Sequence, residues 1–289
     1  MGSKKGDPLA YEDELPQHEE KSITQRYLIS RYPVTNAQFQ AFVDDLEGYR
    51  HDRWWTQAGL QWRGERTGPK KAGGVFDLPN HPVVIVTWYE AVAFCHWLNE
   101  KFHVPGSALS GSATKGSKFQ VWHDRSVETI NLETWNLKHG TWHIRLPTEA
   151  EWEKAASWAE EQGSKGAGGK KRIWPWGDDF DPEKCNSVEA GIGSTCAVGL
   201  FPKGDSPYGC ADMAGNVWEW CQSKWVGNYQ HYDQGVQERE ALEGNDPRVV
   251  RGGSFYYSRR FVRCASRSRF SPVNFSRYTG FRLVVSPSS

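Results

Sequence analysis

The 289-residue sequence has no net charge and no long apolar run. Its 35 Lys and Arg residues balance 35 Asp and Glu residues, so nucleic acid and anionic membranes have no electrostatic attraction to the chain as a whole. No apolar stretch reaches the roughly 18 residues that a membrane span requires. We therefore expect neither nucleic acid nor a membrane as a partner.

Cysteine is also scarce, with six residues, which is too few for a disulfide scaffold. Cys185 and Cys196 could bridge a loop or remain reduced. Residues 1–21 lack the apolar core of a secretory signal peptide. These features favour a cytoplasmic protein. Aromatic residues, by contrast, make up 13% of the chain, which indicates large buried or contacting areas.

One segment lacks residue types that the rest of the chain uses freely. Residues 255–279 contain no Lys, Glu, Gln, Met, Trp or Asp, and they are rich in Phe, Tyr, Ser and Arg. All fifteen Trp residues lie at or before Trp225. This restricted set requires an explanation, either in the gene or in the function of the segment.

Outside this segment the sequence predicts a mixed α+β protein. Capping boxes of the form T-x-x-E/Q at Thr35, Thr87 and Thr148 begin three predicted helices, over residues 35–46, 87–102 and 148–161. Short β-branched or glycine-interrupted runs predict strands within 26–34, 81–88, 248–255 and 280–285. Residues 104–142 are typical of an insertion and 163–172 of a basic loop. No linker divides the chain, so we expect a single domain over residues 1–289.

Seven motifs resemble, in sequence and in order, the formylglycine-generating-enzyme (sulfatase-modifying factor) family. They occupy residues 31–43, 81–98, 145–156, 174–186, 199–220, 248–255 and 280–284. The resemblance implies a C-type lectin-like fold of the formylglycine-generating subtype, with much irregular structure. Met1–Ser3 also resembles the end of the family's first strand, which implies that a segment missing here could precede it.

The resemblance does not extend to the family's copper site. The founding enzymes oxidise a substrate cysteine with copper held by two Cys thiolates just after R-G-G-S, and here those positions read Tyr257 and Val262. Another branch uses iron held by histidines of an extra helical domain. His139 and His143 are four residues apart, but their context favours loop residues. The sequence therefore predicts no copper and no enzymatic activity.

The resemblance also implies two structural calcium sites, because the family holds Ca²⁺ with oxygen ligands around the G-N-V-W-E-W motif. The first would use Asp212, Gly215, Val217 and Glu219. Alternatively, the two carboxylates cap loops and pair with arginines. The second would use Asn186, Ser187 and the carbonyl of Ile192, although Ala190 stands where an acidic ligand is expected.

The restricted residue set of the C-terminal segment has an explanation at the level of codons. If AAC codons were randomised at their first two bases, Lys, Glu, Gln, Met and Trp would be unreachable. Residues 251–284 therefore resemble the variable region of a diversity-generating retroelement protein. The diversified, ligand-binding positions would be Phe255, Tyr256, Tyr257, Ser258, Phe261, Ser266, Ser268, Phe270, Ser271, Val273, Asn274, Phe275, Ser276 and Tyr278. The fixed positions would be Arg251, Gly252, Gly253, Ala265, Pro272, Gly280, Phe281 and Arg282.

This pattern predicts a non-catalytic protein that binds a protein ligand through a diversified surface, in the way that antibody loops use Tyr and Ser. Two alternatives for function remain: a copper-dependent formylglycine-generating oxidase and an accessory domain of a signalling protein. The aromatic residues could also be core residues, and the arginines could be ion-paired. The oligomeric state stays open.

Overall fold

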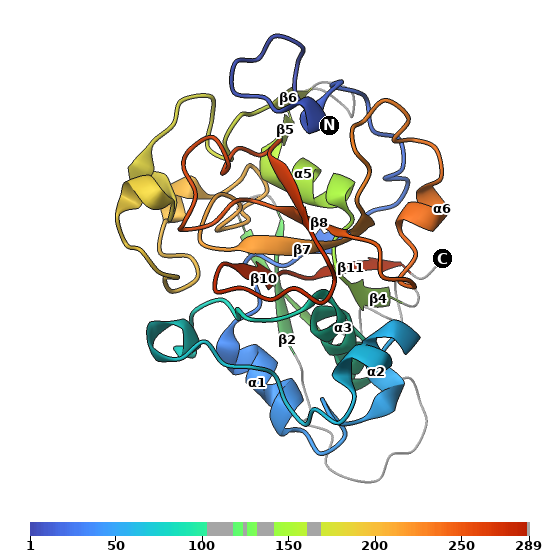
Figure 1. Ribbon diagram of the computed structural model, residues 1–289. Helices are drawn as coiled ribbons and strands as arrows, with labels where there is room; N and C mark the ends of the chain where they lie inside the picture. Colours follow the sequence, from blue (N-terminus) through green and yellow to red (C-terminus); the bar gives the residue numbers. More distant parts are fainter. Residues whose placement is uncertain (103–117, 124–125, 132–141, 161–168, 288–289) are drawn as a thin grey trace.

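The computed structural model describes residues 1–102, 118–123, 126–131, 142–160 and 169–287 (Figure 1). Two small sheets form its centre. One is antiparallel and has the order β1 (Leu28–Ile29), β11 (Val284–Pro287), β4 (Trp142–Arg145). The other has the order β10 (Thr279–Phe281), β7 (Trp218–Lys224), β8 (Arg248–Arg251), β9 (Arg267–Phe270). In this second sheet β10 pairs in parallel with β7, and the other pairs are antiparallel.

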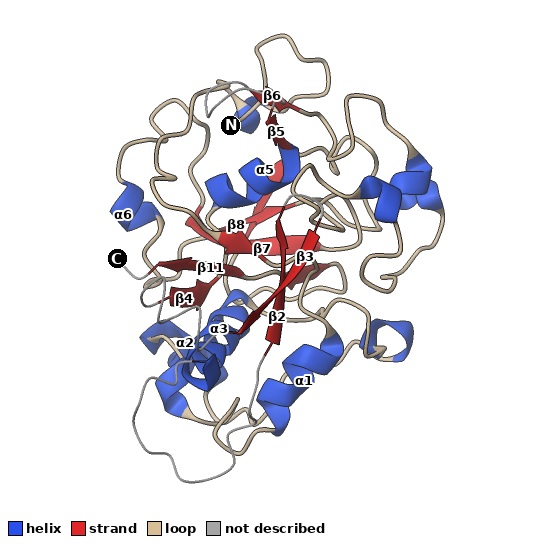
Figure 2. Cartoon of the chain, turned by 180° about the vertical axis from the view of Figure 1, so that it is seen from behind, coloured by secondary structure: helices blue, strands red, loops and turns tan. Residues whose placement is uncertain are grey.

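Helices lie on both sides of these sheets. Figures 1 and 2 show α5 on one side of β7 and β8, and α1, α2 and α3 on the other. The helices are α1 (Asn36–Asp44), α2 (Gln57–Arg63), α3 (Trp88–Phe102), α5 (Glu149–Ser157) and α6 (Val236–Arg239). Two hairpins complete the fold: β2 (Lys118–His123) with β3 (Ser126–Asn131), and β5 (Trp158–Glu160) with β6 (Gly169–Lys171).

The capping boxes predicted at the starts of α1, α3 and α5 are confirmed. The Thr35 and Thr148 hydroxyls each accept a hydrogen bond from the backbone N–H three residues later, and their own backbone N–H groups donate to the side chains of Gln38 and Glu151. At Thr87 the backbone N–H donates to Glu90 Oε2 at 2.8 Å, and the Glu90 N–H donates to Thr87 Oγ1 at 3.3 Å. These bonds satisfy N–H groups that have no partner within the helix, which fixes where each helix begins.

The main core lies between the second sheet and the helices α1 and α3. Phe39, Phe94, Trp220 and Phe281 are buried there, and the ring centroids of Phe94 and Phe281 are 5.6 Å apart. A smaller core lies under α5 and includes Trp152. Both cores contain strand residues of the C-terminal third, so this part of the chain is integral to the fold.

Two of the strand predictions and one loop prediction need correction. Residues 81–88 form no strand, because Ile85 has a φ of 58° that breaks the extended backbone. Instead, the N–H groups of Val83 and Ile85 donate singly to the carbonyls of Val34 and Ser276, at 2.8 and 2.9 Å. The strand predicted within 26–34 shortens to β1, and the basic loop predicted at 163–172 contains β6.

The structure describes only part of the predicted insertion. Of the predicted insertion 104–142, the structure describes β2, β3 and the first residue of β4, and His139 lies outside the described residues. All six cysteines are buried and free, including Cys185 and Cys196. Among the described residues no helix has the length and apolar character to cross a membrane.

Candidate ligand-binding surface

The turn R-G-G-S redirects the chain from β8 into the C-terminal loops. Gly252 and Gly253 have φ values of 95° and 70°, a region that favours glycine. A Cβ on Gly253 would lie 2.6 Å from Val262 Cγ1. Tight packing around this turn therefore holds residues 254–266 in one position relative to the sheet.

We expect Gly253→Ala to lower the free energy of unfolding by about 2 kcal/mol or more, because strain at positive φ and overpacking add together. Gly209→Ala is the matched control. Gly209 also has a positive φ, 76°, but nothing lies within 4 Å of the point that an added Cβ would occupy, so only backbone strain is introduced. Urea unfolding would measure the difference, and equal losses in both variants would show that the contact with Val262 is unimportant.

Buried arginines anchor the C-terminal segment to the rest of the protein. Arg263 forms two hydrogen bonds to Glu14, at 2.9 and 2.6 Å. Arg267 forms two to Glu149, both 2.8 Å long. Because fully desolvated charges must remain paired, each contact permits one arrangement of the backbone around it. The sequence left open whether these arginines are ion-paired. The structure shows that they are, and that Arg251 and Arg282 are ion-paired as well.

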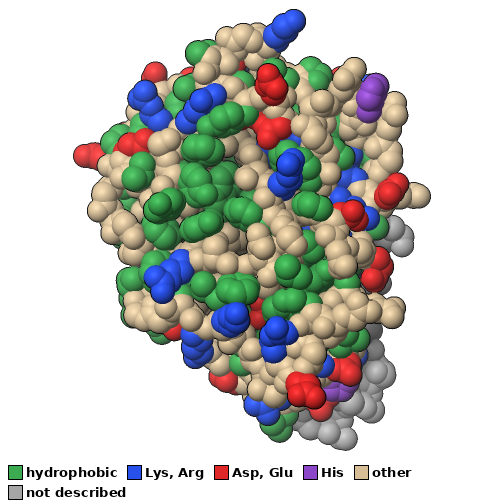
Figure 3. Space-filling model, in the orientation of Figure 1, with side chains coloured by type: hydrophobic (Ala, Val, Ile, Leu, Met, Phe, Trp, Pro, Cys, Tyr) green, Lys and Arg blue, Asp and Glu red, His purple; other side chains and the backbone are tan. Residues whose placement is uncertain are grey.

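Above this buried frame lies a set of aromatic residues that we call the aromatic surface: the contacting rings of Tyr256, Tyr257, Phe261, Phe270 and Tyr278, together with the exposed Phe275. Tyr256 is 68% exposed and stacks on Tyr278 at a centroid distance of 6.2 Å. Tyr257 contacts Tyr278 and Phe261 at 5.8 and 5.1 Å. Figure 3 shows hydrophobic side chains gathered on this face of the molecule, with Lys and Arg side chains below them.

The inner rings of the aromatic surface pack on the core. Tyr257 lies edge-on to Trp218 at 5.6 Å, and Phe270 lies edge-on to Trp220 at 6.0 Å. Burial, followed by the neighbouring phenol of Tyr278, raises the pKa of Tyr257, so its hydroxyl stays neutral and able to donate. The surface therefore places exposed rings on top of rings that are already fixed by the core, which lowers the entropy cost of binding.

The polar candidates lie around these rings. Val273 and Asn274 are exposed, and the following set is half-buried: Ser258, Ser268, Ser271 and Ser276. The loop between Ser271 and Ser276 is held by backbone bonds, in which Trp88 N–H donates to the Pro272 carbonyl at 3.1 Å and Asn274 N–H to the Ser271 carbonyl at 2.9 Å. These residues could supply hydrogen bonds at the rim of a ligand.

Two of the predicted contact residues are not part of the exposed face. Phe255 is 6% exposed, with its ring 5.9 Å from that of Phe76, and Ser266 is fully buried. The path of the chain turns both side chains inward, where they pack on the scaffold. Neither can contact a ligand without rearrangement of the loop.

Sequence reasoning missed residues from other parts of the chain that border the aromatic surface. The ring of Tyr11 lies 5.4 Å from that of Phe261, and Lys70 Nζ lies 4.1 Å from the centroid of Phe275. Arg277 covers the ring of Phe76 at 5.6 Å. No local pattern in the sequence identifies Tyr11, Lys70 or Phe76, because only the folded chain brings them to this face.

The first predicted calcium site has its main carboxylate already engaged. Glu219 Oε1 accepts from Arg282 Nη2 at 2.7 Å, and Oε2 accepts from Arg282 Nε at 2.5 Å and from Trp152 Nε1 at 2.6 Å. Burial raises the pKa of Asp212 to about 6, although the hydrogen bond from the Gly199 N–H acts to lower it. An ion at this set, with Gly215 and Val217, would have to share the Glu219 carboxylate with Arg282 and Trp152, and the charge of Arg282 opposes a cation.

The second predicted calcium site has an acceptor without a partner. Asn186 Oδ1 is buried and makes no hydrogen bond within the described chain, although its Nδ2 donates to the Ser194 carbonyl at 2.9 Å. Ser187 Oγ donates to Glu189 Oε2 at 2.7 Å, which brings a carboxylate to this loop, whereas Ile192 is exposed. The other oxygen of Glu189 accepts from the Arg259 N–H at 2.8 Å, so the unsatisfied buried oxygen of Asn186 is the feature that suits a hard cation here.

The positions that match the copper ligands of the family do not fit copper. Tyr257 is an aromatic residue of the surface and Val262 is fully buried. Cys264 lies nearby, but its thiol is buried and contacts the Ala156 carbonyl at 3.6 Å. Burial raises the pKa of Cys264 to about 12, and no cysteine stands at either matching position, so the thiolate pair that holds copper in the family is missing.

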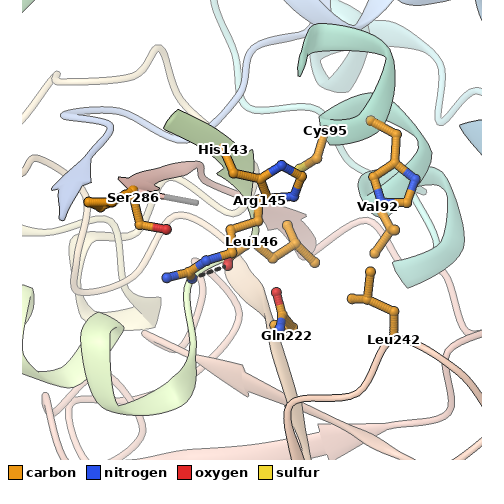
Figure 4. Close-up of a pocket in the computed structure, with 10 residues that line it drawn as sticks. Val92, Cys95, His143, Arg145, Leu146, Gln222, Leu242 and Ser286 are labelled. Atoms are coloured by element: carbon orange, nitrogen blue, oxygen red, sulfur yellow. Dashed lines mark hydrogen bonds between the residues drawn. The ribbon is translucent and has the colours of Figure 1, made fainter. Parts of the chain in front are cut away.

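A cavity of about 390 Å³ lies elsewhere, between α3, β4, β7 and β11 (Figure 4). Its lining residues are Val92, Cys95, His96, His143, Arg145, Leu146, Gln222, Leu242, Ser286 and Pro287. The guanidinium of Arg145 is held by both oxygens of Glu151, at 2.7 and 2.6 Å. None of the residues predicted to bind a ligand lines this cavity.

Comparison with known proteins places these features in a family. The model described as "Sulfatase-modifying factor enzyme 1-like domain" matches residues 1–287. The chain is 31% identical to hercynine oxygenase of Mycolicibacterium thermoresistibile, over 96% of this chain and 54% of that protein. It is 29% identical to the formylglycine-generating enzyme of Thermomonospora curvata, over 90% and 82%. The chain thus spans about half the length of the hercynine oxygenase.

Solved structures with the same fold include PvdO from Pseudomonas aeruginosa, with a TM-score of 0.60 and 19% identity over 99% of this chain and 90% of that one. Treponema denticola variable protein 1 has a TM-score of 0.54 and 22% identity, over 90% and 84%. These likenesses confirm the C-type lectin-like fold of the formylglycine-generating subtype.

The expectation that the chain is not an enzyme is wrong for its family. Hercynine oxygenase and formylglycine-generating enzyme are named enzymes, and they align with most of the chain. The missing copper ligands and the scattered histidines do not decide activity, because one fold can support more than one chemistry.

Proposed function

The chain belongs to the sulfatase-modifying factor enzyme 1-like family, and on this premise we propose that its aromatic surface binds a polypeptide ligand. One observation carries the proposal: exposed and half-buried tyrosines and phenylalanines in mutual ring contact rest on a frame of buried ion pairs. Tyrosine and phenylalanine provide large contact areas at a low entropy cost, and aromatic residues contribute much of the binding energy of protein interfaces.

The distribution of burial supports diversification of this surface. All eight positions assigned to the fixed scaffold are buried, from Arg251 to Arg282. Of the fourteen positions assigned to diversification, Phe255 and Ser266 are buried and the others are at least partly exposed. Substitution at the exposed positions would change the contacts offered to a ligand and leave the ion-paired frame in place.

The experiment that tests binding is selection of peptides from a random display library on the immobilised chain. We expect the selected peptides to compete with one another, because they share the aromatic surface, and to lose binding to a Tyr256→Ser, Phe275→Ser double variant. A parallel selection on a Tyr208→Ser variant, which removes an exposed ring outside this surface, provides the control. Peptides that bind the double variant as well as the original chain would contradict the proposal.

A second candidate function is substrate binding in an oxidation reaction, and the 31% identity to hercynine oxygenase favours it. On this alternative the aromatic surface holds the substrate of the oxidation. Oxygen uptake by the full-length protein, measured with hercynine and iron or with a cysteine-containing peptide and copper, separates this candidate from binding alone.

A third candidate, an accessory domain of a signalling protein, is supported by 30% identity to the serine/threonine-protein kinase pkn1 of Chlamydia pneumoniae, over 94% of this chain and 34% of that protein. In that setting the aromatic surface would recruit a partner to an enzyme carried elsewhere in the same protein. Binding of a selected peptide without oxygen uptake agrees with this candidate.

We further propose that a structural Ca²⁺ binds at Asn186, Ser187 and the Ile192 carbonyl, where Asn186 Oδ1 is an unpaired acceptor among the described residues. Calcium should then raise the melting temperature by about 5 °C at saturation, because it binds only the folded chain. The Asn186→Ala variant should lose this calcium-dependent increase, and Asp212→Asn should retain it. An equal increase in both variants, or none in the original chain, would contradict this site.

A further inference from the structure

The N-terminal segment meets a distant loop beside the buried Glu149. The Tyr229 N–H donates to the Leu15 carbonyl at 2.9 Å, which joins the two segments. The imidazole of His18 then lies against the rings of Tyr229 and Tyr232, with centroid distances of 5.1 and 5.6 Å. These contacts restrict the orientation of the imidazole ring, which lies next to two carboxylates.

Three potential ligand atoms converge at this position. One atom each from His18, Glu20 and Asp233 lies within 4.8 Å of the other two, and within the described residues this is the single group of its kind. His18 Nε2 and Glu20 Oε2 are 3.3 Å apart. Two ligands of a tetrahedral Zn²⁺, with bonds of about 2.0–2.1 Å, lie about 3.3 Å apart, so this spacing suits a shared ion.

The imidazole of His18 is largely buried, and its Nε2 faces Glu20. Its Nδ1 is buried and makes no hydrogen bond in the described part of the chain. The side chains of His18 and Glu20 are 15% and 8% exposed, whereas Asp233 is exposed. This Nδ1 is not the nitrogen whose distance to Glu20 suits an ion, so the case for the site rests on the convergence of the three ligand atoms. The exposed Asp233 leaves a path by which an ion could enter.

We propose that His18, Glu20 and Asp233 bind a divalent transition-metal ion of the Zn²⁺ class, with water completing the coordination. One imidazole with two carboxylates suits zinc and its neighbours, whereas calcium and magnesium prefer oxygen ligands alone. The ion links the N-terminal segment to the loop that carries Tyr229 and Tyr232, both of which donate to Glu149, at 2.9 and 3.0 Å. It is therefore a structural tether.

One neighbouring charge limits the affinity of this site. Arg239 lies over the ring of Tyr232 at 3.7 Å, and its Nε donates to Glu240 Oε1 at 2.9 Å. Its charge is therefore partly compensated by Glu240, but it still opposes a second cation. With three protein ligands and this arginine nearby, we expect binding weaker than that of a closed four-ligand zinc site.

The test is titration of the chelator-treated chain with Zn²⁺, followed by calorimetry and thermal unfolding. We expect one ion per chain, a melting temperature raised by about 5 °C at saturation, and much weaker binding of Ca²⁺. Asp233→Asn should weaken zinc binding at least tenfold, and because Asp233 is exposed, the variant should fold normally.

Glu19→Gln is the matched control, since Glu19 is exposed, lies between two of the ligands and is not part of the group. It should bind zinc as the original chain does. The proposal is overturned if the original chain binds no zinc, if Asp233→Asn and Glu19→Gln bind it equally, or if calcium binds as tightly as zinc.

Discussion

Glu149→Gln is expected to lower the free energy of unfolding by about 3–5 kcal/mol, the range measured when one partner of a buried ion pair is removed. Glu149 is fully buried and accepts from Arg267 at 2.8 Å, from Arg251 at 3.0 Å and from the hydroxyls of Tyr229 and Tyr232. Glutamine has a similar shape but no charge, so both arginines would lose a counter-charge. Urea unfolding monitored by circular dichroism would measure the loss.

Two further variants make this result interpretable. Tyr232→Phe removes one hydrogen bond to Glu149 and should cost about 1 kcal/mol. Glu238→Gln, at an exposed position of α6, should change stability by less than about 0.5 kcal/mol. If Glu149→Gln cost no more than Glu238→Gln, the ion pairs would not be what holds the C-terminal segment in place.

Tyr256→Ala and Tyr278→Ala should separate binding from folding. Tyr256 is 68% exposed, so its loss should leave stability nearly unchanged and weaken a selected peptide by about 30-fold, as expected for an interface residue worth about 2 kcal/mol. Tyr278 is half-buried and contacts Tyr257 and Phe270, at 5.8 and 6.4 Å. Its removal should weaken binding and also cost about 2–4 kcal/mol of stability.

Fluorescence titration with the selected peptide and urea unfolding give the two quantities for each variant. Tyr208→Ala, which removes an exposed ring elsewhere, should change neither appreciably. A large loss of stability in Tyr256→Ala would mean that this ring belongs to the core. Unchanged peptide affinity in both tyrosine variants would exclude the aromatic surface as the binding site.

Local signals in the sequence predicted the helix starts correctly. Thr35, Thr87 and Thr148 begin helices because a capping box involves residues only three positions apart. The positions of the C-terminal segment that we predict to be fixed are all buried, and their invariance stays a prediction. This prediction depended on the order of the family's motifs along the whole chain, which no single motif contains.

Other features depend on contacts between distant residues. A β-branched run at 81–88 predicted a strand, but Ile85 adopts a positive φ and its N–H donates to Ser276, almost two hundred positions later. The motif around Glu219 left calcium binding and arginine pairing as alternatives, and in the structure this carboxylate accepts from Arg282 and Trp152, while calcium binding stays a prediction. Neighbouring residues in the sequence do not indicate which of several possible partners a side chain or N–H group contacts in the folded chain.

The sequence by itself determined the family, the helix starts and the unusual residue set of the C-terminal segment. These follow from composition and from short-range hydrogen bonding, which are encoded in neighbouring residues. Only the tertiary structure decided which aromatic residues face outward, which carboxylates are already paired, and that His18 and Glu20 meet Asp233. Those outcomes depend on burial, because the cost of removing a charge or a ring from water is set by everything packed around it.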